Sequence, residues 1–386
     1  RLLIKRFEFN PSLWLTTITQ KKWVHINNPL RYDSTFFPDL TLLSEKCYIN
    51  GPLYLTNQIN RNKVTATATG NVEWAYIKED INNISENDFL IKTKFLGLDA
   101  ALRLLIRDSD EFLFRVKEND ILHGNIVGEV IESNNSDFQI GDYVVGSLGI
   151  QTYAISDGVG IEKVDTNFAP PEYWLGGMGI PGLTAYYALL DVCKPTVDKN
   201  VLITGAAGAV GSIAGQIAKI CGSKVFGTTG SQEKCDWLVN ELGYDYAFNY
   251  NDKDWFSKLK DASEGKLDII FDNSGGEVMN QSLKIIGLNG IVLLCGSTSQ
   301  YYEDEMKGPS NYIWLGTMRA RLQGFVIFDY ENRYNEARVN LGKWLKEDKI
   351  KMPNYIIESS IDAFPNAFED LFSGKNFGKM ILKLND

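Results

Sequence analysis

Three glycines at intervals of three, Gly205, Gly208 and Gly211, are the residues whose spacing points most clearly to chemistry. They follow a short apolar or β-branched run and precede an alanine- and isoleucine-rich stretch with helical spacing. Glycine is unfavourable inside a helix, so it must serve another purpose here. At the start of a helix, free N–H groups and the positive end of the dipole attract phosphate, and a Cβ would hold the phosphate away. The pattern Ala206-x-Gly208-x-x-Gly211 therefore predicts a binding site for a dinucleotide pyrophosphate.

A second cluster indicates which dinucleotide binds. NAD sites usually carry Asp or Glu at the end of the second strand, where the carboxylate holds the ribose 2′-hydroxyl. In this sequence Thr228, Thr229, Gly230 and Ser231 occupy that place, and Lys234 follows in the first helical turn. Hydroxyl groups, a helix N-terminus and a cation suit a 2′-phosphate. We therefore predict NADPH as the cofactor.

The elements that position these residues alternate between strand and helix. Strand patterns alternating with helix patterns at this spacing predict a doubly wound parallel sheet, and thus an α/β fold. The part of the chain before it is rich in short strand-like segments, as in 88–98, 121–133 and 141–149, which predicts a β-rich domain. The expected strands of the parallel sheet are 200–204, 223–229, 246–250, 267–273 and 290–296, and the expected helices are 209–220, 231–242, 254–262 and 278–286.

Composition limits the classes of partner. The chain has 386 residues, enough for two domains, and a formal net charge of −10. An acidic chain without a basic cluster argues against binding to nucleic acid or to anionic membranes. The sequence has no apolar run of about 18 residues, so we predict no membrane-spanning segment. The five cysteines are scattered and only two histidines occur, so we predict no metal site and a reducing compartment, the cytoplasm. Basic residues dominate residues 1–32, which leaves an organelle-targeting segment and an ordinary surface extension as alternatives.

Eight motifs, in order along the chain, resemble one known family. The sequence is similar to the zinc-independent medium-chain dehydrogenase/reductases, in the group of prostaglandin reductase, leukotriene B4 12-hydroxydehydrogenase and alkenal double-bond reductases. This resemblance implies a Rossmann nucleotide domain at 171–331, inserted into a β-rich GroES-like substrate domain at 53–170 and 332–386. Residues 1–52 would then be an N-terminal extension of unknown role. The motifs are GMGIPGLTAYYALL (177–190), GAAGAVGS (205–212), GSQEK (230–234), FNY (248–250), FDNSGG (271–276), CGSTSQY (295–301), GFVIFDY (324–330) and NFGKMILKL (376–384).

The resemblance also implies roles for individual residues. Lys234 and Tyr250 would hold the 2′-phosphate side of NADPH, and Asn376 would reach the cofactor from the C-terminal tail. Tyr301 would lie near the nicotinamide ribose and the substrate carbonyl, as the catalytic residue. The full predicted cofactor-binding set is Gly208, Ala209, Val210, Gly211, Ser231, Lys234, Tyr250, Asn273, Cys295, Tyr301 and Asn376.

The resemblance implies reduction of the activated C=C bond of α,β-unsaturated aldehydes and ketones, including alkenals and 15-oxo-prostaglandin-like enones, by a homodimer. Hydride transfer to the β-carbon needs no metal, because conjugation already polarises the acceptor, whereas an alcohol dehydrogenase would need zinc ligands. An NADPH quinone oxidoreductase of the same superfamily and a non-catalytic NADPH-binding structural or sensor protein are the alternatives. One departure concerns the substrate pocket: Asp99 and Arg103 match a family motif, but Ala101 stands where the family often has tyrosine.

Overall fold

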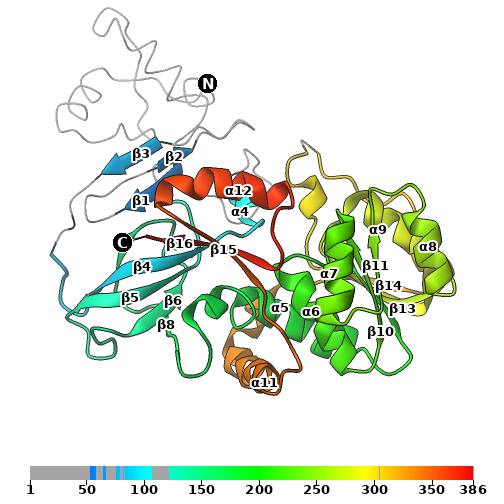
Figure 1. Ribbon diagram of the computed structural model, residues 1–386, viewed down its shortest axis with the longest axis horizontal. Helices are drawn as coiled ribbons and strands as arrows, with labels where there is room; N and C mark the ends of the chain where they lie inside the picture. Colours follow the sequence, from blue (N-terminus) through cyan, green and yellow to red (C-terminus); the bar gives the residue numbers. More distant parts are fainter. Residues whose placement is uncertain are drawn as a thin grey trace, which may run out of the picture.

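The computed structural model describes residues 53–57, 64–66, 75–78, 81, 83–106, 121–303 and 305–385. Two sheets organise this part of the chain, and Figure 1 shows them in two neighbouring lobes. The predicted extension at residues 1–52 lies outside the described residues.

The first of the two sheets is parallel and has six strands in the order β11-β10-β9-β12-β13-β14. Every residue of strand β12 is buried, because helices cover both faces of the sheet, and this explains the three successive apolar residues at 269–271. The predicted doubly wound sheet is thus confirmed. The strands are β9 (Asn200–Ile203), β10 (Lys224–Thr229), β11 (Tyr246–Asn249), β12 (Leu267–Asp272), β13 (Ile286–Leu294) and β14 (Arg321–Gly324), and the helices are α6 (Ala209–Ile220), α7 (Gln232–Leu242), α8 (Trp255–Ala262) and α9 (Gly276–Ser282).

The second sheet has seven strands and is mostly antiparallel, with the order β15-β16-β4-β5-β6-β8 and with β7 paired to β4. After the parallel sheet the chain returns to this lobe, where β16 lies antiparallel to β4, with Ile381 opposite Gly97. The strands are β4 (Phe89–Gly97), β5 (Ile126–Ser133), β6 (Tyr143–Gly146), β7 (Tyr153–Ser156), β8 (Glu162–Lys163), β15 (Asn354–Ser359) and β16 (Lys379–Leu384). Three further strands, β1 (Leu53–Asn57), β2 (Val64–Ala66) and β3 (Ala75–Lys78), pair with one another.

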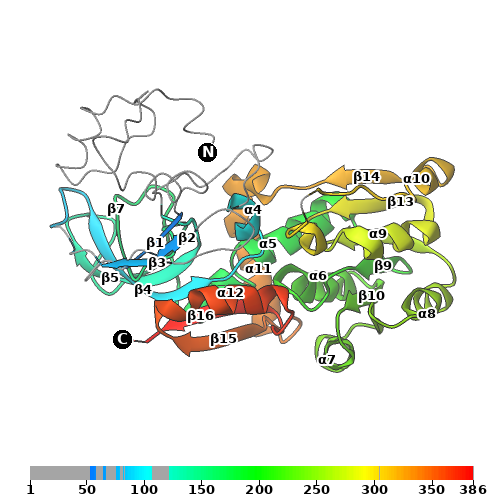
Figure 2. The same cartoon turned by 90° about the horizontal axis from the view of Figure 1, so that it is seen from above.

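Further helices pack on the two lobes. Helix α12 packs on β16, and Figure 2 shows it beside β15 and β16, next to the parallel-sheet lobe. Helix α5 packs against both α6 and α11. The α-helices are α4 (Leu102–Leu105), α5 (Ile180–Tyr187), α10 (Ile313–Thr317), α11 (Tyr334–Lys346) and α12 (Phe364–Phe372), a π-helix spans Ala188–Cys193, and 3-10 turns span Pro171–Leu175, Leu283–Ile285, Thr298–Gln300, Ile327–Arg333 and Ile361–Ala363.

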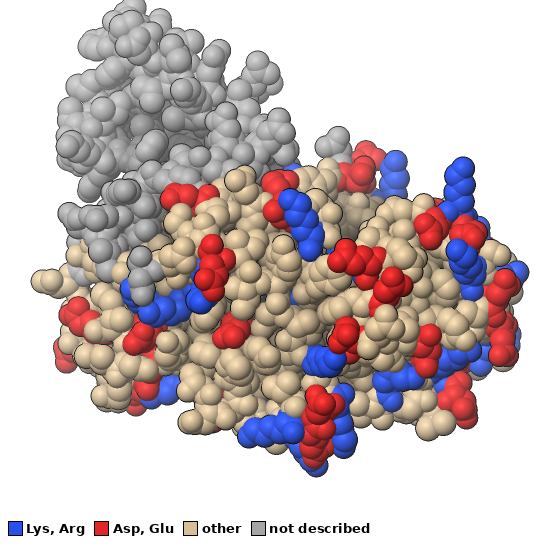
Figure 3. All heavy atoms as spheres, viewed as in Figure 1, with Lys and Arg blue, Asp and Glu red and all other residues tan. Residues whose placement is uncertain are grey.

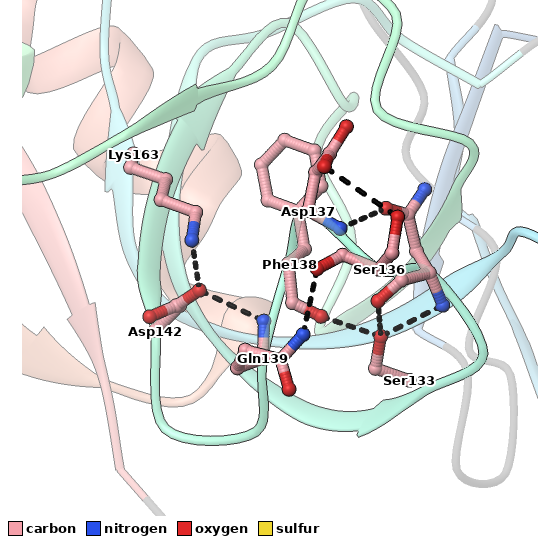
Figure 4. A network of polar contacts seen from close by, with 8 residues as sticks. Ser133, Ser136, Asp137, Phe138, Gln139, Asp142 and Lys163 are labelled. Atoms are coloured by element: carbon pink, nitrogen blue, oxygen red, sulfur yellow. Dashed lines mark hydrogen bonds and ion pairs between the residues drawn. The ribbon is translucent and has the colours of Figure 1, made fainter.

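A polar network closes the turn between β5 and β6 (Figure 4). The hydroxyl of Ser133 donates to the carbonyl of Phe138 at 2.6 Å, and the backbone N–H of Gln139 donates to Asp142 at 2.8 Å. Lys163 pairs with Asp142 at 2.7 Å. Although burial raises the pKa of Asp142, the bonds from Lys163 and Gln139 outweigh it and lower that pKa below its usual value. The network therefore holds the turn with the carboxylate charged.

Candidate active site

The glycine turn between β9 and α6 leaves free space next to the backbone of Gly208. An added Cβ at Gly211 would lie 2.5 Å from the carbonyl oxygen of Gly205, so this glycine allows close packing of the helix on the turn. At Gly208 an added Cβ would meet only that same oxygen, at 3.3 Å. No described side chain caps the start of α6, whose first residues are Ala209 and Val210. The free space at Gly208 and the uncapped N–H groups at the start of α6 fit the pyrophosphate of a dinucleotide.

The C-terminal tail lies directly on this turn. The N–H of Gly378 donates to the carbonyl of Ala207 at 2.8 Å, and Gly378 forms a parallel bridge with Gly208. Asn376 is buried, and its amide donates to the carbonyl of Gly378 at 2.7 Å. The structure thus brings Asn376 beside the glycine turn, and its contact with the cofactor stays a prediction.

The residues predicted for the 2′-phosphate gather at the ends of β10 and β11. Ser231 caps α7, its hydroxyl accepting from the N–H of Lys234 at 3.3 Å. The Tyr250 hydroxyl lies over the other side of this turn, 2.8 Å from where a Cβ on Gly230 would stand. The Lys234 side chain is only 8% exposed, and no carboxylate of the described residues forms an ion pair with it. Burial lowers the pKa of Lys234, and Glu233 partly opposes this shift.

A buried carboxylate that the sequence did not single out organises the centre of the sheet. Asp272, at the end of β12, accepts from the Thr204 hydroxyl at 2.6 Å and from the N–H of Gly275 at 3.0 Å. Asn273 turns its amide to the carbonyl of Thr204, at 2.8 Å. Burial raises the pKa of Asp272, and these hydrogen bonds act in the opposite direction. Because β9 and β12 are neighbours where the strand order reverses, the network shapes the crevice in which such sheets bind ligands.

Two other predicted site residues, Cys295 and Tyr301, follow the end of β13. Burial raises the pKa of the Cys295 thiol to about 12, so this thiol is protonated at neutral pH and is no nucleophile. Tyr301 is 8% exposed, and its hydroxyl accepts from the N–H of Ser297 at 3.3 Å. The phenol therefore faces its own loop and is more buried than the small polar neighbours suggested. Its hydrogen remains available for an acceptor, and its catalytic role stays a prediction.

Arg103 and Asp99, the two residues that match the family motif around Ala101, lie in the antiparallel lobe. The Arg103 guanidinium lies 4.4 Å from the ring centre of Tyr302, and among the described residues its Nε has no hydrogen-bond partner. The Tyr302 hydroxyl donates to the Glu369 carboxylate at 3.2 Å, so this tyrosine connects the loop after β13 with α4 and α12. Asp99 pairs with the buried Lys379 at the start of β16. The residue expected to alter the pocket, Ala101, is exposed.

Comparison with known proteins places this arrangement in a family. A family model for the N-terminal domain of oxidoreductase matches residues 58–164, and one for zinc-binding dehydrogenase matches residues 209–342. Prostaglandin reductase 1 of Rattus norvegicus is 37% identical over 307 residues, which cover 78% of this chain and 90% of that protein. The chain belongs to the zinc-independent medium-chain dehydrogenase/reductases. The predicted family and its α/β fold are thus confirmed.

Two further members of this family are similar along most of the chain. The NADP⁺-dependent 2-alkenal reductase of Nicotiana tabacum is 33% identical over 302 residues, 78% of this chain and 88% of that protein. The crystal structure of CurA from Vibrio vulnificus in complex with NADPH superposes with a TM-score of 0.77 at 33% identity, covering 81% of this chain and 95% of that one.

The described residues contain no group of three or more His, Cys, Asp or Glu side chains that could hold a metal ion. In the same part of the chain, no helix is long and apolar enough to cross a bilayer.

We expect the activity to survive treatment with a chelator and the purified protein to carry no stoichiometric zinc by elemental analysis. One zinc per chain, or loss of turnover that zinc restores, would contradict the prediction of a metal-free site.

Proposed function

We propose that this protein is an NADPH-dependent reductase of the activated C=C bond of α,β-unsaturated aldehydes and ketones. The buried Lys234, which has no carboxylate partner among the described residues, supports the choice of NADPH over NADH. The similarity to a prostaglandin reductase and to a 2-alkenal reductase supports the substrate class. The scattered cysteines, of which the described four are free, support a reducing compartment, the cytoplasm.

Some residues of this chain would bind the cofactor, and others would stabilise the negative charge that develops on the substrate. Bound NADPH supplies a hydride for the β-carbon of the substrate, and a proton must then reach the α-carbon to give the saturated product. Gly208 and the start of α6 would hold the pyrophosphate, and Lys234 with Ser231 and Tyr250 the 2′-phosphate. As the C=C bond is reduced, negative charge develops on the carbonyl oxygen, and a hydrogen-bond donor there lowers the barrier. Tyr301 is our candidate donor, since its hydroxyl hydrogen is not used by the bond from Ser297.

Steady-state oxidation of NADPH tests the proposal with 2-alkenals, 15-oxo-prostaglandin-like enones and quinones. We expect turnover with the alkenals and enones to exceed turnover with quinones. Faster turnover of quinones would favour the quinone oxidoreductase, and NADPH binding without turnover of any of them would favour a non-catalytic protein.

Removal of the Tyr301 hydroxyl should slow the reaction without weakening the cofactor. Loss of one such donor typically lowers kcat by about 10²–10³-fold. A ribose hydroxyl of the cofactor would share the task, so for Tyr301→Phe we expect the lower end of this range or less, with the KM for NADPH nearly unchanged. Tyr246→Phe is the control, because this phenol is exposed at the start of β11, away from the carboxyl ends of the strands. An unchanged kcat, with a deuterium isotope effect showing that hydride transfer limits the rate, would reduce Tyr301 to a packing role.

We also propose that the protein is a homodimer formed along β14. This strand ends the parallel sheet, and among the described residues only β13 pairs with it, so its outer backbone groups are available to a second copy. Exposed apolar side chains surround it, which favours an interface. They are Tyr312, Ile313, Leu322, Val326 and Phe328.

Elsewhere, acidic and basic side chains alternate over the face in Figure 3, in keeping with the expectation that no nucleic acid binds.

A charge in this apolar surface should separate the copies. Ile313 is 65% exposed, so Ile313→Glu should leave the fold intact but reduce the mass measured by light scattering from twice the chain mass to one chain mass. Val159→Glu is the matched control, because Val159 is 83% exposed in the other lobe. A dimer that persists in Ile313→Glu, or a monomeric unmutated protein, would contradict this interface.

A further inference from the structure

Lys234 is held by an aromatic ring instead of a carboxylate. Its ammonium nitrogen lies 5.6 Å from the ring centre of Phe377, within the range of a cation–π interaction. Trp237 stands one turn further along α7, on the same face, and its ring meets that of Phe377 edge-on, with centroids 5.3 Å apart. Phe377 therefore lies against both residues.

The backbone on both sides of Phe377 is anchored. Asn376 donates to the carbonyl of Gly378, and the N–H of Gly378 donates to Ala207 in the glycine turn. Gly378 has a φ of +75°, and a Cβ there would lie 2.2 Å from the carbonyl oxygen of Pro353, so only glycine fits. These bonds fix the ring relative to the cofactor turn (Figure 1 shows the segment between α12 and β16 reaching toward α6).

The ammonium also reaches the tail itself. A Cβ on Gly374 would lie 3.6 Å from the Lys234 nitrogen, so the lysine side chain extends between α7 and the segment after α12. A carboxylate at the position of Phe377 would bind the lysine but cancel its charge. A ring face attracts the cation through its quadrupole and leaves the charge available to an incoming anion.

We propose that Phe377 is a positioning residue for the 2′-phosphate of NADPH: its ring holds the Lys234 ammonium in place without neutralising it. This rests on the proposed function, in which Lys234 binds that phosphate. It gives the C-terminal tail a part in selecting NADPH over NADH, since the ring comes from the tail and the lysine from the nucleotide lobe.

Calorimetric binding of two cofactor fragments tests this directly. The probes are adenosine 2′,5′-bisphosphate and adenosine 5′-monophosphate, which differ only in the 2′-phosphate. We expect Phe377→Leu to weaken binding of the bisphosphate about 3- to 10-fold, as loss of a partly desolvated cation–π contact would, and to change binding of the monophosphate less than about twofold. Phe377→Tyr, which keeps the ring, should restore the affinity. In a Lys234→Ala background, Phe377→Leu should have no further effect on the bisphosphate.

Each other result has a distinct meaning. An equal loss for both probes, or a loss that persists in the Lys234→Ala background, would show that the ring only packs the tail and would overturn the inference. An unchanged affinity of the bisphosphate in Phe377→Leu would overturn it too. If the unmutated protein binds both probes equally well, the proposed preference for NADPH fails instead. Phe377→Met, which keeps apolar volume without a ring, provides the same comparison if the leucine variant does not fold.

Discussion

Gly208→Ala should bind NADPH at least about 10²-fold more weakly than the unmutated protein while remaining folded. The backbone at Gly208 has φ −81° and ψ −179°, which alanine adopts without strain. The new methyl group would touch only the carbonyl of Gly205 and would otherwise project into open space. That space is where we expect the pyrophosphate to approach the start of α6, and displacement of a charged group from its N–H donors costs several kcal/mol.

Two further variants isolate this effect. Gly316→Ala, in α10, adds a methyl group that meets nothing within 4 Å, and it should leave NADPH affinity unchanged. Gly211→Ala would place its Cβ within 3 Å of backbone atoms of the turn, so it should lower the melting temperature as well as the affinity. Isothermal titration with thermal melts distinguishes these outcomes. Full affinity in Gly208→Ala would show that the cofactor does not use this turn.

Lys234→Ala should lower the affinity for NADPH about 10- to 150-fold and leave that for NADH within about twofold. One lost charge-assisted contact accounts for about 1.5–3 kcal/mol, and the lysine would meet only the cofactor that carries a 2′-phosphate. No carboxylate of the described residues pairs with Lys234, so its removal leaves no buried acid behind.

The control is Lys258→Ala, because Lys258 lies exposed on α8 and pairs with Asp254. It removes the same charge away from the candidate site and should leave both cofactor affinities unchanged. Similar affinity of the unmutated protein for NADPH and NADH, or an equal loss of both in Lys234→Ala, would show that the lysine does not select the cofactor.

The parallel sheet could be predicted because its signals are local. Apolar runs, glycine turns and helical periodicity all lie within a few residues of one another, and the helix predicted at 209–220 is the observed α6. Strand β14 was missed because its four residues, Arg321 to Gly324, are mostly exposed and carry almost no apolar signal. It is recognised as a strand only through its pairing with β13.

Several features of the site depend on contacts between distant segments. The bond from Thr204 to Asp272 joins the ends of two strands that are neighbours only in the folded sheet. Asp272 does follow three apolar residues directly, Ile269, Ile270 and Phe271, and an acid at the end of such a strand is a signal that could have indicated it. The contact of Phe377 with Lys234 has no such signal, because the tail must first return to the glycine turn.

Transfer of a label from NADPH to product tests the central claim most directly. The enzyme is supplied with NADPH deuterated at the transferable C4 position and with a simple α,β-unsaturated ketone, and the product is analysed by mass spectrometry and NMR. We predict a saturated ketone that carries one deuterium at the β-carbon. An allylic alcohol with deuterium at the former carbonyl carbon, or oxidation of NADPH without a labelled organic product, would contradict the assignment as a C=C reductase.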